Sequence, residues 1–280
     1  MAAPTSTAPP NAAGDDAPVI VFDHVRLAFD EKVVLKDVSF TLGKGHTKII
    51  IGGSGSGKST ALKIAIGLLK ADGGAVWVDG QRVDQLTERQ MMPVRANLGM
   101  IFQEGALFDS LTVRENVGYK LYEETKMPLD QVDARVEEVL GFIGLAEHID
   151  KMPSELSGGQ RRRVAIARAM AFKPATLLYD EATTGLDPIL ATTVDDEIIK
   201  LRDLEDVTTV IVTHQLRDAF YVATHMAERD ANGAVRIVPA TPAKEREAEF
   251  IMLRDGLIIF EGDADALRRS RDPYIKEFLS

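Results

Sequence analysis

The sequence predicts an α/β fold organised around a phosphate-binding loop, and two observations support this. First, the glycine-rich stretch 52–60 follows the apolar run 47–51 and precedes the segment 61–69, which has helical spacing. Strand, glycine loop and helix in this order are the context of a phosphate-binding P-loop. Second, a later hydrophobic strand ends in Asp180 and Glu181, and α/β sheets bind their ligands where the strands end.

The predicted P-loop consists of Gly52, Gly53, Ser54, Gly55, Ser56, Gly57, Lys58, Ser59 and Thr60. Its glycines allow backbone N–H groups to turn inward around an anion, because no Cβ stands in the way. The helix then begins with its positive end toward the same anion. We expect Lys58 to reach the β- and γ-phosphates of a nucleotide, and Ser59 to place its hydroxyl on Mg²⁺. A flexible Gly/Ser linker is the alternative, which the flanking strand and helix disfavour.

Composition limits the class of protein. The 280 residues fit one large domain or two small ones. Hydrophobic residues make up 45% of the chain, which is enough for a sizeable core, and the net charge of -10 disfavours binding to bare nucleic acid. The absence of cysteine removes disulfides and thiolate metal sites. No apolar run approaches the ~20 residues of a membrane helix and no secretory signal pattern is evident, so we expect a protein soluble inside the cell, with any membrane role supplied by a partner.

The N-terminal part predicts a tail followed by antiparallel strands. Residues 1–17 are rich in Ala, Pro, Thr and Asp and have no apolar period, which indicates a disordered tail before a folded unit at 18–280. Short strands are predicted at 19–22, 25–29, 33–35 and 38–42. Phe29 lies where a strand meets a loop, so it could stack on an adenine ring or pack in the core. Its own pattern favours the core.

Two further strands follow the P-loop helix. The strand 75–78 alternates, and we expect its Trp77 to pack in the core. The apolar strand 99–102 ends on Gln103. A polar amide at a strand end is either a surface residue or a ligand-facing one, and this residue alone does not decide between them.

Residues 104–155 have helical character. Thr112 and Glu115 form a capping box that opens one helix. The segment 130–140 has the apolar spacing of a second amphipathic helix. The region therefore predicts a helical insert between two strands of the sheet.

A second anion-ready helix start follows the insert. Ser157, Gly158 and Gly159 stand immediately before a helical segment, as in the P-loop. The arginines at 161–163 could form a nucleic-acid patch, but they run directly into the apolar residues 164–167. A helix that packs on the core is the favoured interpretation.

Acidic and basic side chains follow the next two strands. Asp180 is placed to hold Mg²⁺ through water, and Glu181 to polarise a water against the γ-phosphate. A simple acidic turn after a strand is the alternative, and the presence of a P-loop in the same chain disfavours it. The β-branched strand 207–213 ends on His214, which would face the ligand edge of a parallel sheet. The other histidines show no metal-ligand spacing.

The C-terminal third predicts secondary structure only. Residues 228–248 are polar and weakly patterned, which indicates a surface hairpin or loop. Residues 250–262 predict a closing β-hairpin, and residues 273–280 a short helix.

Taken together, these motifs resemble the ATP-binding subunits of ABC transporters over residues ~18–280. In that family's order, the chain has the P-loop, the Q-loop Gln103, the signature 156–160, the Walker B strand 177–180, Glu181, the D-loop 185–187 and the switch His214. The resemblance implies a P-loop NTPase ABC ATPase fold, with an antiparallel β subdomain and an α-helical subdomain at about 104–168.

The resemblance also implies how the site works. Two copies would form a head-to-tail homodimer that clamps ATP between the P-loop of one copy and the signature of the other. The implied ATP-binding residues outside the P-loop are Phe29, Ser157, Gly158, Gly159, Gln160 and Asp187. Ser59, Gln103 and Asp180 would organise Mg²⁺. The implied catalytic residues are Lys58, Gln103, Glu181 and His214, with Glu181 acting on water and His214 contacting the γ-phosphate.

Two segments resemble a narrower group, the Mla-type lipid-transport ATPases. They are residues 102–113 and 151–159. This resemblance implies a membrane permease, an MCE-domain lipid-binding partner and phospholipid transport between bacterial membranes, with the ATPase peripheral on the cytoplasmic face of the inner membrane. Residues 105–113 are the candidate permease contact. Ordinary packing of Leu107 and Phe108 within the insert is the equally weighted alternative.

Other readings remain open or are disfavoured. An ATPase of another ABC class, such as an amino-acid importer or a lipoprotein exporter, would have the same catalytic residues. ABC proteins acting on DNA or ribosomes carry long coiled coils or two cassettes, and this chain shows neither. An inactive module is disfavoured because every catalytic position is filled. Ala182 stands where the family usually has proline, and we expect slower or equal hydrolysis from this change rather than loss.

Overall fold

The computed structural model of this chain describes residues 17–103 and 105–280. The predicted tail at 1–17 therefore lies outside the described residues except for Ala17. The strands are β1 Ile20–Phe29, β2 Lys32–Leu42, β3 Thr47–Ile51, β4 Gly73–Val78, β5 Gln81–Arg82, β6 Leu98–Ile101, β7 Thr176–Asp180, β8 Thr208–Thr213, β9 His225–Arg229, β10 Val235–Pro239, β11 Ala248–Arg254 and β12 Leu257–Gly262.

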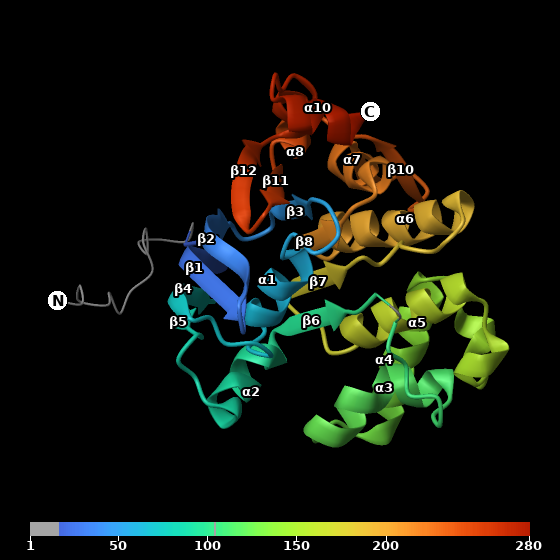
Figure 1. Cartoon of the computed structure of the whole chain (residues 1–280). Coiled ribbons are helices and arrows are strands. Elements are labelled where there is room, and N and C mark those ends of the chain that lie inside the picture. Colours follow the sequence, from blue (N-terminus) through green and yellow to red (C-terminus); the bar gives the residue numbers. More distant parts are fainter. Residues whose placement is uncertain (1–16, 104) are drawn as a thin grey trace.

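Helices cover both faces of the central β-sheet (Figure 1). The helices are α1 Lys58–Ala65, α2 Glu88–Ala96, α3 Val113–Glu124, α4 Leu129–Phe142, α5 Gly158–Met170, α6 Pro188–Leu204, α7 Leu216–Thr224, α8 Pro242–Glu245, α9 Ala264–Arg268 and α10 Pro273–Leu279, with the short 3₁₀ turns η1 Ala146–His148 and η2 Pro153–Glu155. None of the helices in the described part of the chain is long and apolar enough to cross a bilayer.

A ten-stranded sheet forms the centre, in the order β5-β4-β1-β2-β12-β11-β3-β8-β7-β6. The strands β3, β8, β7 and β6 run parallel, as the α/β prediction requires. Alternate residues of β7 pack into the hydrophobic cores on opposite faces of the sheet. Leu177 and Tyr179 pack with α5 and α6, whereas Leu178 packs with α1. Burial on both faces explains why these strands read as continuous apolar runs.

The four short strands predicted at the N-terminal end are two long strands. β1 and β2 pair antiparallel along their length, with register shifts between Phe22 and Val25 and again near Leu27. His24 has a positive φ of 51° within β1, which is the backbone of a bulge. The polar interruptions that suggested separate strands are therefore bulges within continuous ones. Trp77 is 2% exposed, so its predicted packing role is confirmed.

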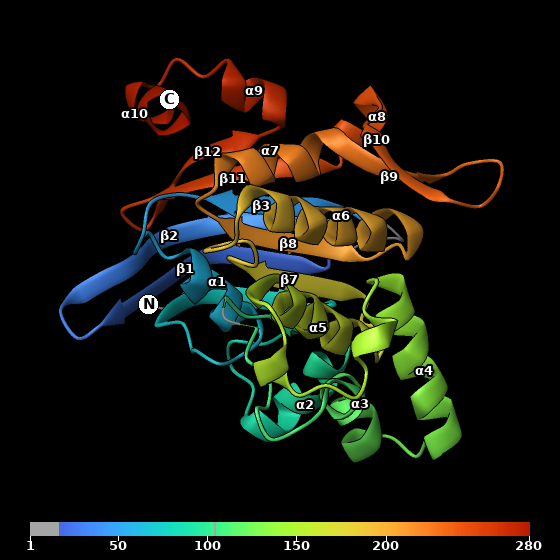
Figure 2. The same ribbon diagram turned by 90° about the vertical axis from the view of Figure 1, so that its right-hand side faces the viewer.

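Both predicted insert helices are present, and α3, α4 and α5 lie together beside the sheet (Figure 2). At the start of α3, the Thr112 hydroxyl accepts from the N–H of Glu115 at 3.2 Å, and the Glu115 carboxylate accepts from the Thr112 N–H at 2.7 Å. The capping box read from the sequence is thus formed. The helix α2 was not predicted; it contains Pro93 and buries only Met91 and Val94.

The C-terminal predictions are also confirmed. Residues 228–248 contain most of the β9–β10 hairpin and the short α8. β11 and β12 form the closing hairpin, and β11 joins the parallel part of the sheet beside β3. α10 matches the predicted terminal helix, while α9 was not predicted.

Candidate nucleotide-binding and hydrolysis site

Four neighbouring parallel strands each deliver one predicted site element at the same edge of the sheet. The P-loop follows β3, His214 follows β8, Asp180 and Glu181 end β7, and Gln103 lies just after β6. These strands are adjacent in the order β3-β8-β7-β6. The carboxyl edge of such a sheet is where α/β proteins bind ligands, so the topology gathers residues that are more than 150 positions apart along the chain.

The P-loop backbone requires glycine at defined positions. Gly52 has φ 150°, and a Cβ there would lie 2.3 Å from the Leu253 carbonyl oxygen. Gly57 has φ 105° and would place a Cβ 2.6 Å from Leu35. Gly57 also caps α1 without any side-chain hydrogen bond. The first N–H groups of α1 therefore face the loop, which is the arrangement that binds a phosphate.

Lys58 lies folded against this loop. Its Nζ donates to the carbonyls of Gly52 at 2.8 Å and Gly53 at 3.0 Å, and it lies 3.9 Å from Glu181 Oε1. Burial lowers the pKa of Lys58, opposed by the negative charges of Glu181 and Asp180. A cation held among loop carbonyls at the start of a helix is placed to meet the negative charge of a nucleotide phosphate.

Ser59 and Asp180 offer oxygen atoms suited to Mg²⁺. The Ser59 hydroxyl donates to Asp180 Oδ1 at 2.6 Å, which joins the helix α1 to the end of β7. Burial raises the pKa of Asp180, and the hydrogen bond from Ser59 opposes this shift. No cluster of three or more acidic or histidine ligands occurs within residues 17–103 and 105–280. Mg²⁺ commonly binds with one or two protein oxygens plus phosphate and water, so the donor set fits it.

Glu181 occupies the centre of the arrangement in a left-handed backbone conformation with φ 51°. Its Oε1 lies 3.2 Å from His214 Nδ1, and its Oε2 accepts from the Thr184 hydroxyl at 3.2 Å. The Glu181 N–H donates to the Val212 carbonyl at 2.8 Å. Thr184 was not among the predicted site residues. It lies three positions after Glu181, and the turn closed by its N–H, which donates to the Glu181 carbonyl at 3.1 Å, brings the two side chains together.

The signature forms a second helix start. The Ser157 hydroxyl accepts from the Gln160 N–H at 3.3 Å, and the Gln160 side chain accepts from the Ser157 N–H at 2.8 Å. Ser157 and Gly158 are exposed, whereas Gly159 is buried against Leu190 of α6. Within the described part of the chain, no hydrogen bond or ion pair joins residues 157–160 to the P-loop. One chain thus presents two separate anion-ready helix starts.

The remaining predicted residues lie near the surface. Asp187 caps α6, where its Oδ1 accepts from the N–H groups of Ile189 and Leu190. Gln103 is exposed directly after β6. Phe29 is 47% exposed at the end of β1, so the expectation that it belongs to the core is wrong. The chain turns at Asp30, with φ 52°, directly after Phe29 at the end of β1. The Phe29 ring therefore stays partly exposed and available for stacking.

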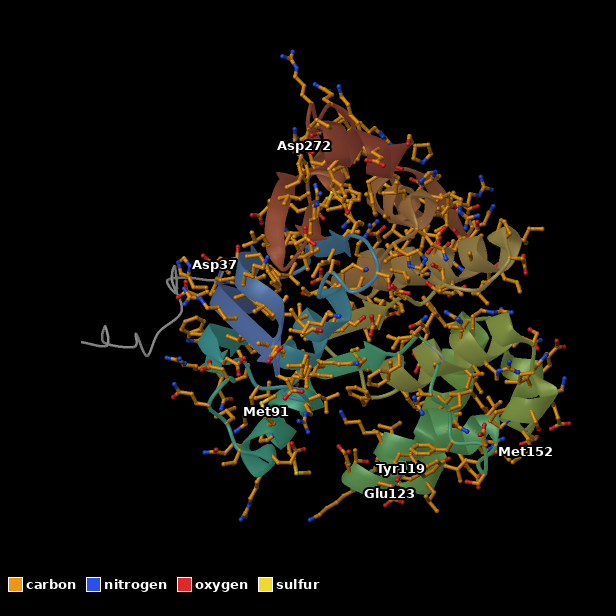
Figure 3. The ribbon with its side chains drawn as sticks, in the orientation of Figure 1. Asp37, Met91, Tyr119, Glu123, Met152 and Asp272 are labelled. Atoms are coloured by element: carbon orange, nitrogen blue, oxygen red, sulfur yellow. The ribbon has the colours of Figure 1, made fainter. Side chains whose placement is uncertain are left out.

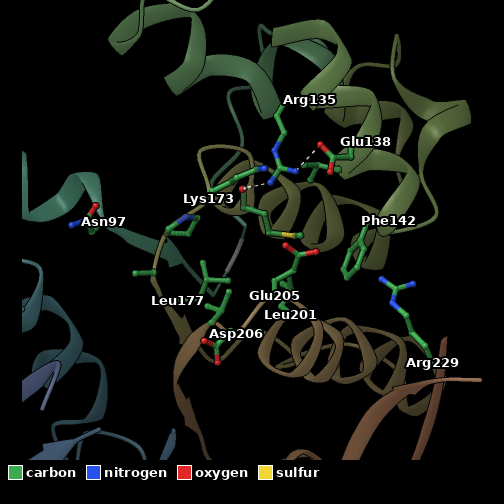
Figure 4. A pocket seen from close by; sticks show the side chains of 15 residues that line it. Asn97, Arg135, Glu138, Phe142, Lys173, Leu177, Leu201, Glu205, Asp206 and Arg229 are labelled. Carbon is green, nitrogen blue, oxygen red and sulfur yellow. Dashed lines mark hydrogen bonds and ion pairs between the residues drawn. The ribbon is translucent and has the colours of Figure 1, made fainter. Parts of the chain in front are cut away.

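A separate hollow of about 630 Å³ lies at the opposite edge of the sheet (Figure 4). Its walls combine three basic and three acidic side chains, Arg135, Lys173, Arg229, Glu138, Glu205 and Asp206. Arg135 already donates to the Met170 and Ala171 carbonyls at the end of α5 and pairs with Glu138. This balanced charge does not favour a triphosphate, so the hollow is not the nucleotide site.

Comparison with known proteins agrees with this geometry. Residues 35–184, which include the P-loop, the signature and Glu181, match a family model described as ABC transporter. The chain belongs to the ABC transporter family. It is an ATP-binding subunit of that family and an ATPase, and the predicted ABC ATPase fold is confirmed.

Individual relatives and solved structures agree with the ABC assignment. The protein TRIGALACTOSYLDIACYLGLYCEROL 3, chloroplastic, of Arabidopsis thaliana is 37% identical over 261 residues, covering 90% of this chain and 71% of the relative. The methionine import ATP-binding protein MetN of Bifidobacterium longum is 39% identical over 246 residues, covering 84% of this chain and 61% of the relative. Among solved structures, the ATP-binding cassette MJ0796, a dimer bound to ADP and Pi, has a TM-score of 0.71 at 28% identity, covering 87% of this chain and 98% of that one.

The alanine beside Glu181 yields a first prediction for this ABC ATPase. The Ala182 carbonyl accepts from Arg162 Nη1 at 2.6 Å, so the loop is already anchored without a proline. We therefore expect Ala182→Pro to leave steady-state ATP hydrolysis equal to or modestly above that of the natural chain, as measured by phosphate release. A large fall in rate would show that Glu181 keeps its left-handed backbone only before a residue other than proline.

A second prediction concerns the buried carboxyl group of Asp195, which lies close to Ala182 and Thr183. Asp195 of α6 and Asp218 of α7 line a small cavity with Ala182 and Thr183, and one oxygen of each aspartate has no hydrogen-bond partner among the described residues. Burial, together with the charge of Asp218, raises the pKa of Asp195 from 3.8 to about 8. The folded chain thus keeps this proton between those pH values while the unfolded chain releases it, so the free energy of unfolding falls as pH rises.

Asp195→Asn should remove this pH dependence. One pKa unit corresponds to ~1.4 kcal/mol, so at pH 8 we expect a stabilisation of at most ~5 kcal/mol, and little change near pH 4. Thermal denaturation of both chains from pH 4 to 9 measures the difference. Glu123→Gln is the control, because Glu123 is exposed on α3 (Figure 3). Parallel stability profiles for the wild type and Asp195→Asn would contradict the prediction.

Proposed function

We propose that two copies of this chain associate head to tail and hydrolyse ATP to drive lipid transport through a membrane permease. The observation that carries the dimer is the pair of helix starts in one chain. Ser157 and Gly158 are exposed and make no bond to the P-loop of their own chain, so a second copy would complete each site. The dimeric MJ0796 structure bound to ADP and Pi supports this arrangement.

The side chains have distinct proposed roles. Lys58 and the loop amides hold the phosphates, Ser157, Gly158, Gly159 and Gln160 close the site from the second copy, and Phe29 stacks on adenine. Mg²⁺, when bound, neutralises phosphate charge, and Ser59, Gln103 and Asp180 are the residues that would hold it. Glu181 takes a proton from the attacking water, and His214, 3.2 Å from Glu181, orients that carboxylate and contacts the γ-phosphate.

The segment after Gln103 is the proposed permease contact. Arg168 donates to the carbonyls of Ala106 and Gly105, and Asn116 donates to the carbonyl of Phe108 at 3.0 Å. Leu107 packs against the core, which confirms packing for that residue. Phe108 is 42% exposed and its ring lies 4.6 Å from that of Tyr119, itself 40% exposed. A rigidly held, exposed aromatic pair is suited to receive a partner helix.

Two observations support lipid as the cargo. Residues 102–113 and 151–159 resemble the Mla-type ATPases, and one relative, from Arabidopsis thaliana, is named for a galactolipid. The proposed assembly therefore contains a permease and an MCE-domain lipid-binding protein, with this ATPase peripheral on the cytoplasmic side of the inner membrane. The MetN relative favours a second candidate, an ATPase of an amino-acid importer.

Affinity purification from detergent-solubilised native membranes separates these candidates. We expect the tagged chain to recover a polytopic permease, an MCE-domain protein and phospholipid, identified by mass spectrometry. The double variant Phe108→Asp, Tyr119→Asp should lose the permease while its ATP binding remains. Recovery of a permease with an amino-acid-binding protein and without lipid would reject the lipid proposal and favour the importer.

A further inference from the structure

The three consecutive arginines after the signature each bind a different part of the chain. Arg161 Nη1 donates to the Leu156 carbonyl at 2.6 Å, within the signature itself. Arg163 Nη1 donates to the Ile143 carbonyl at 3.0 Å, at the end of α4. Arg162 donates to the loop after β7. The interpretation of this run as part of a packed helix is confirmed, since all three side chains are engaged within the chain.

Arg162 donates hydrogen bonds to three backbone carbonyls of residues 181–184, the catalytic loop that follows β7. Its Nη1 donates to the carbonyls of Glu181 at 3.1 Å and Ala182 at 2.6 Å, and its Nη2 donates to the carbonyl of Thr184. A guanidinium presents its donors in a fixed planar fork, so these three carbonyls are held in one geometry. The Thr184 hydroxyl in turn donates to the Glu181 carboxylate.

This anchoring matters because Glu181 has an unfavourable backbone. Its φ of 51° lies in the left-handed region, which a residue with a side chain occupies only when its surroundings impose it. Arg162 holds the carbonyl of Glu181 itself and those of Ala182 and Thr184. Where a proline would stiffen this loop covalently, the chain has Ala182 and uses a side chain from another element.

That element is the helix that starts at the signature. Arg162 lies in α5 one turn after Gly158 and Gly159, and residues three or four apart lie on the same side of a helix. A Cβ on Gly159 would lie only 3.1 Å from Leu190 of α6, so the beginning of α5 also packs closely on the helix that follows the D-loop. A displacement of the signature is therefore transmitted to Arg162 by a single rigid helix turn.

We propose that Arg162 is a positioning residue that couples the two ATP sites of the dimer. This inference rests on the proposed head-to-tail dimer. In that dimer, the signature of one chain faces the ATP held by its partner, while Glu181 of the same chain faces its own ATP. Arg162 joins these two half-sites within one chain. Binding of ATP at one site therefore sets the position of Glu181 at the other, and ATP hydrolysis is cooperative.

The test compares Arg162→Gln with the wild-type chain. We expect the Hill coefficient for ATP in steady-state hydrolysis to fall from above 1 to about 1, and kcat to fall about tenfold, since charge-assisted hydrogen bonds are lost. The affinity of the isolated chain for a fluorescent ATP analogue should stay unchanged, because Lys58 and the P-loop are untouched. Arg162→Lys should restore part of the cooperativity.

Arg163→Gln is the matched control, since it removes a carbonyl-binding arginine from the same helix turn. It should retain the wild-type Hill coefficient. Equal cooperativity in Arg162→Gln and the wild type would overturn the inference, as would an equal loss in Arg163→Gln. If the wild type shows no dimer in light scattering even with a non-hydrolysable ATP analogue, the proposed dimer fails instead. A fold defect is detected separately by the melting temperature of each variant.

Discussion

Glu181→Gln should abolish hydrolysis and leave ATP binding intact. The glutamine keeps the shape of the side chain and can still accept the hydrogen bond that Thr184 donates to Glu181. It cannot accept a proton from water. Loss of a general base lowers the rate by about 10²–10⁴-fold, so we expect phosphate release near background. Because the nucleotide is then bound without being consumed, the ATP-bound dimer should accumulate.

Single-turnover phosphate release and light scattering measure these two effects. Glu228→Gln is the control, because Glu228 is an exposed carboxylate of the β9–β10 hairpin. It should hydrolyse ATP like the wild type and form the dimer only transiently. If Glu181→Gln kept a tenth or more of the wild-type rate, another group would be the base, and His214, 3.2 Å from Glu181, would be the candidate.

Lys58→Ala should strongly weaken ATP binding itself. The Lys58 side chain is only 4% exposed and is held by the carbonyls of Gly52 and Gly53, so it is already positioned above the loop. Charge-assisted hydrogen bonds each contribute about 1.5–3 kcal/mol, and the loss of one or two to phosphate lowers affinity on the order of 100-fold. Equilibrium binding of a fluorescent ATP analogue measures this loss.

The control for this variant is Lys70→Ala, which removes an exposed lysine shortly after α1. It should bind ATP like the wild type. The melting temperature of Lys58→Ala is measured in parallel, because the substitution also removes the hydrogen bonds that Lys58 donates to the carbonyls of Gly52 and Gly53. Retained affinity in a folded Lys58→Ala chain would show that the loop N–H groups alone hold the nucleotide.

Local motifs account for what the sequence predicts correctly. The P-loop glycines, the capping box at Thr112, the helix start at Ser157 and the acidic end of β7 each depend on residues within a few positions, so spacing alone identifies them. Their gathering at one sheet edge follows from parallel strand order. Resemblance to a known family was needed to relate the two helix starts to each other.

Contacts between distant segments account for what the sequence does not predict. The bonds of Arg162 to the carbonyls of Glu181 and Ala182 depend on how α5 lies against the end of β7. The joining of the four predicted strands into β1 and β2 depends on bulges paired across the hairpin. The exposure of Phe29 depends on where the β1–β2 hairpin turns. The alternation of residue types does not reveal the position of this turn, so Phe29 was expected in the core.

The proposed catalytic residues and the proposed permease contact belong to separate parts of the structure. Every proposed catalytic group stands at the end of a sheet strand or at the start of α1. The exposed ring pair lies elsewhere, with Tyr119 on α3 of the insert and Phe108 in the preceding segment, which Arg168 and Asn116 hold against the insert. The two relatives are named for a lipid and for methionine import, yet each is 37–39% identical to this chain. If this ring pair is the proposed permease contact, it can change residue by residue without touching the groups at the catalytic edge.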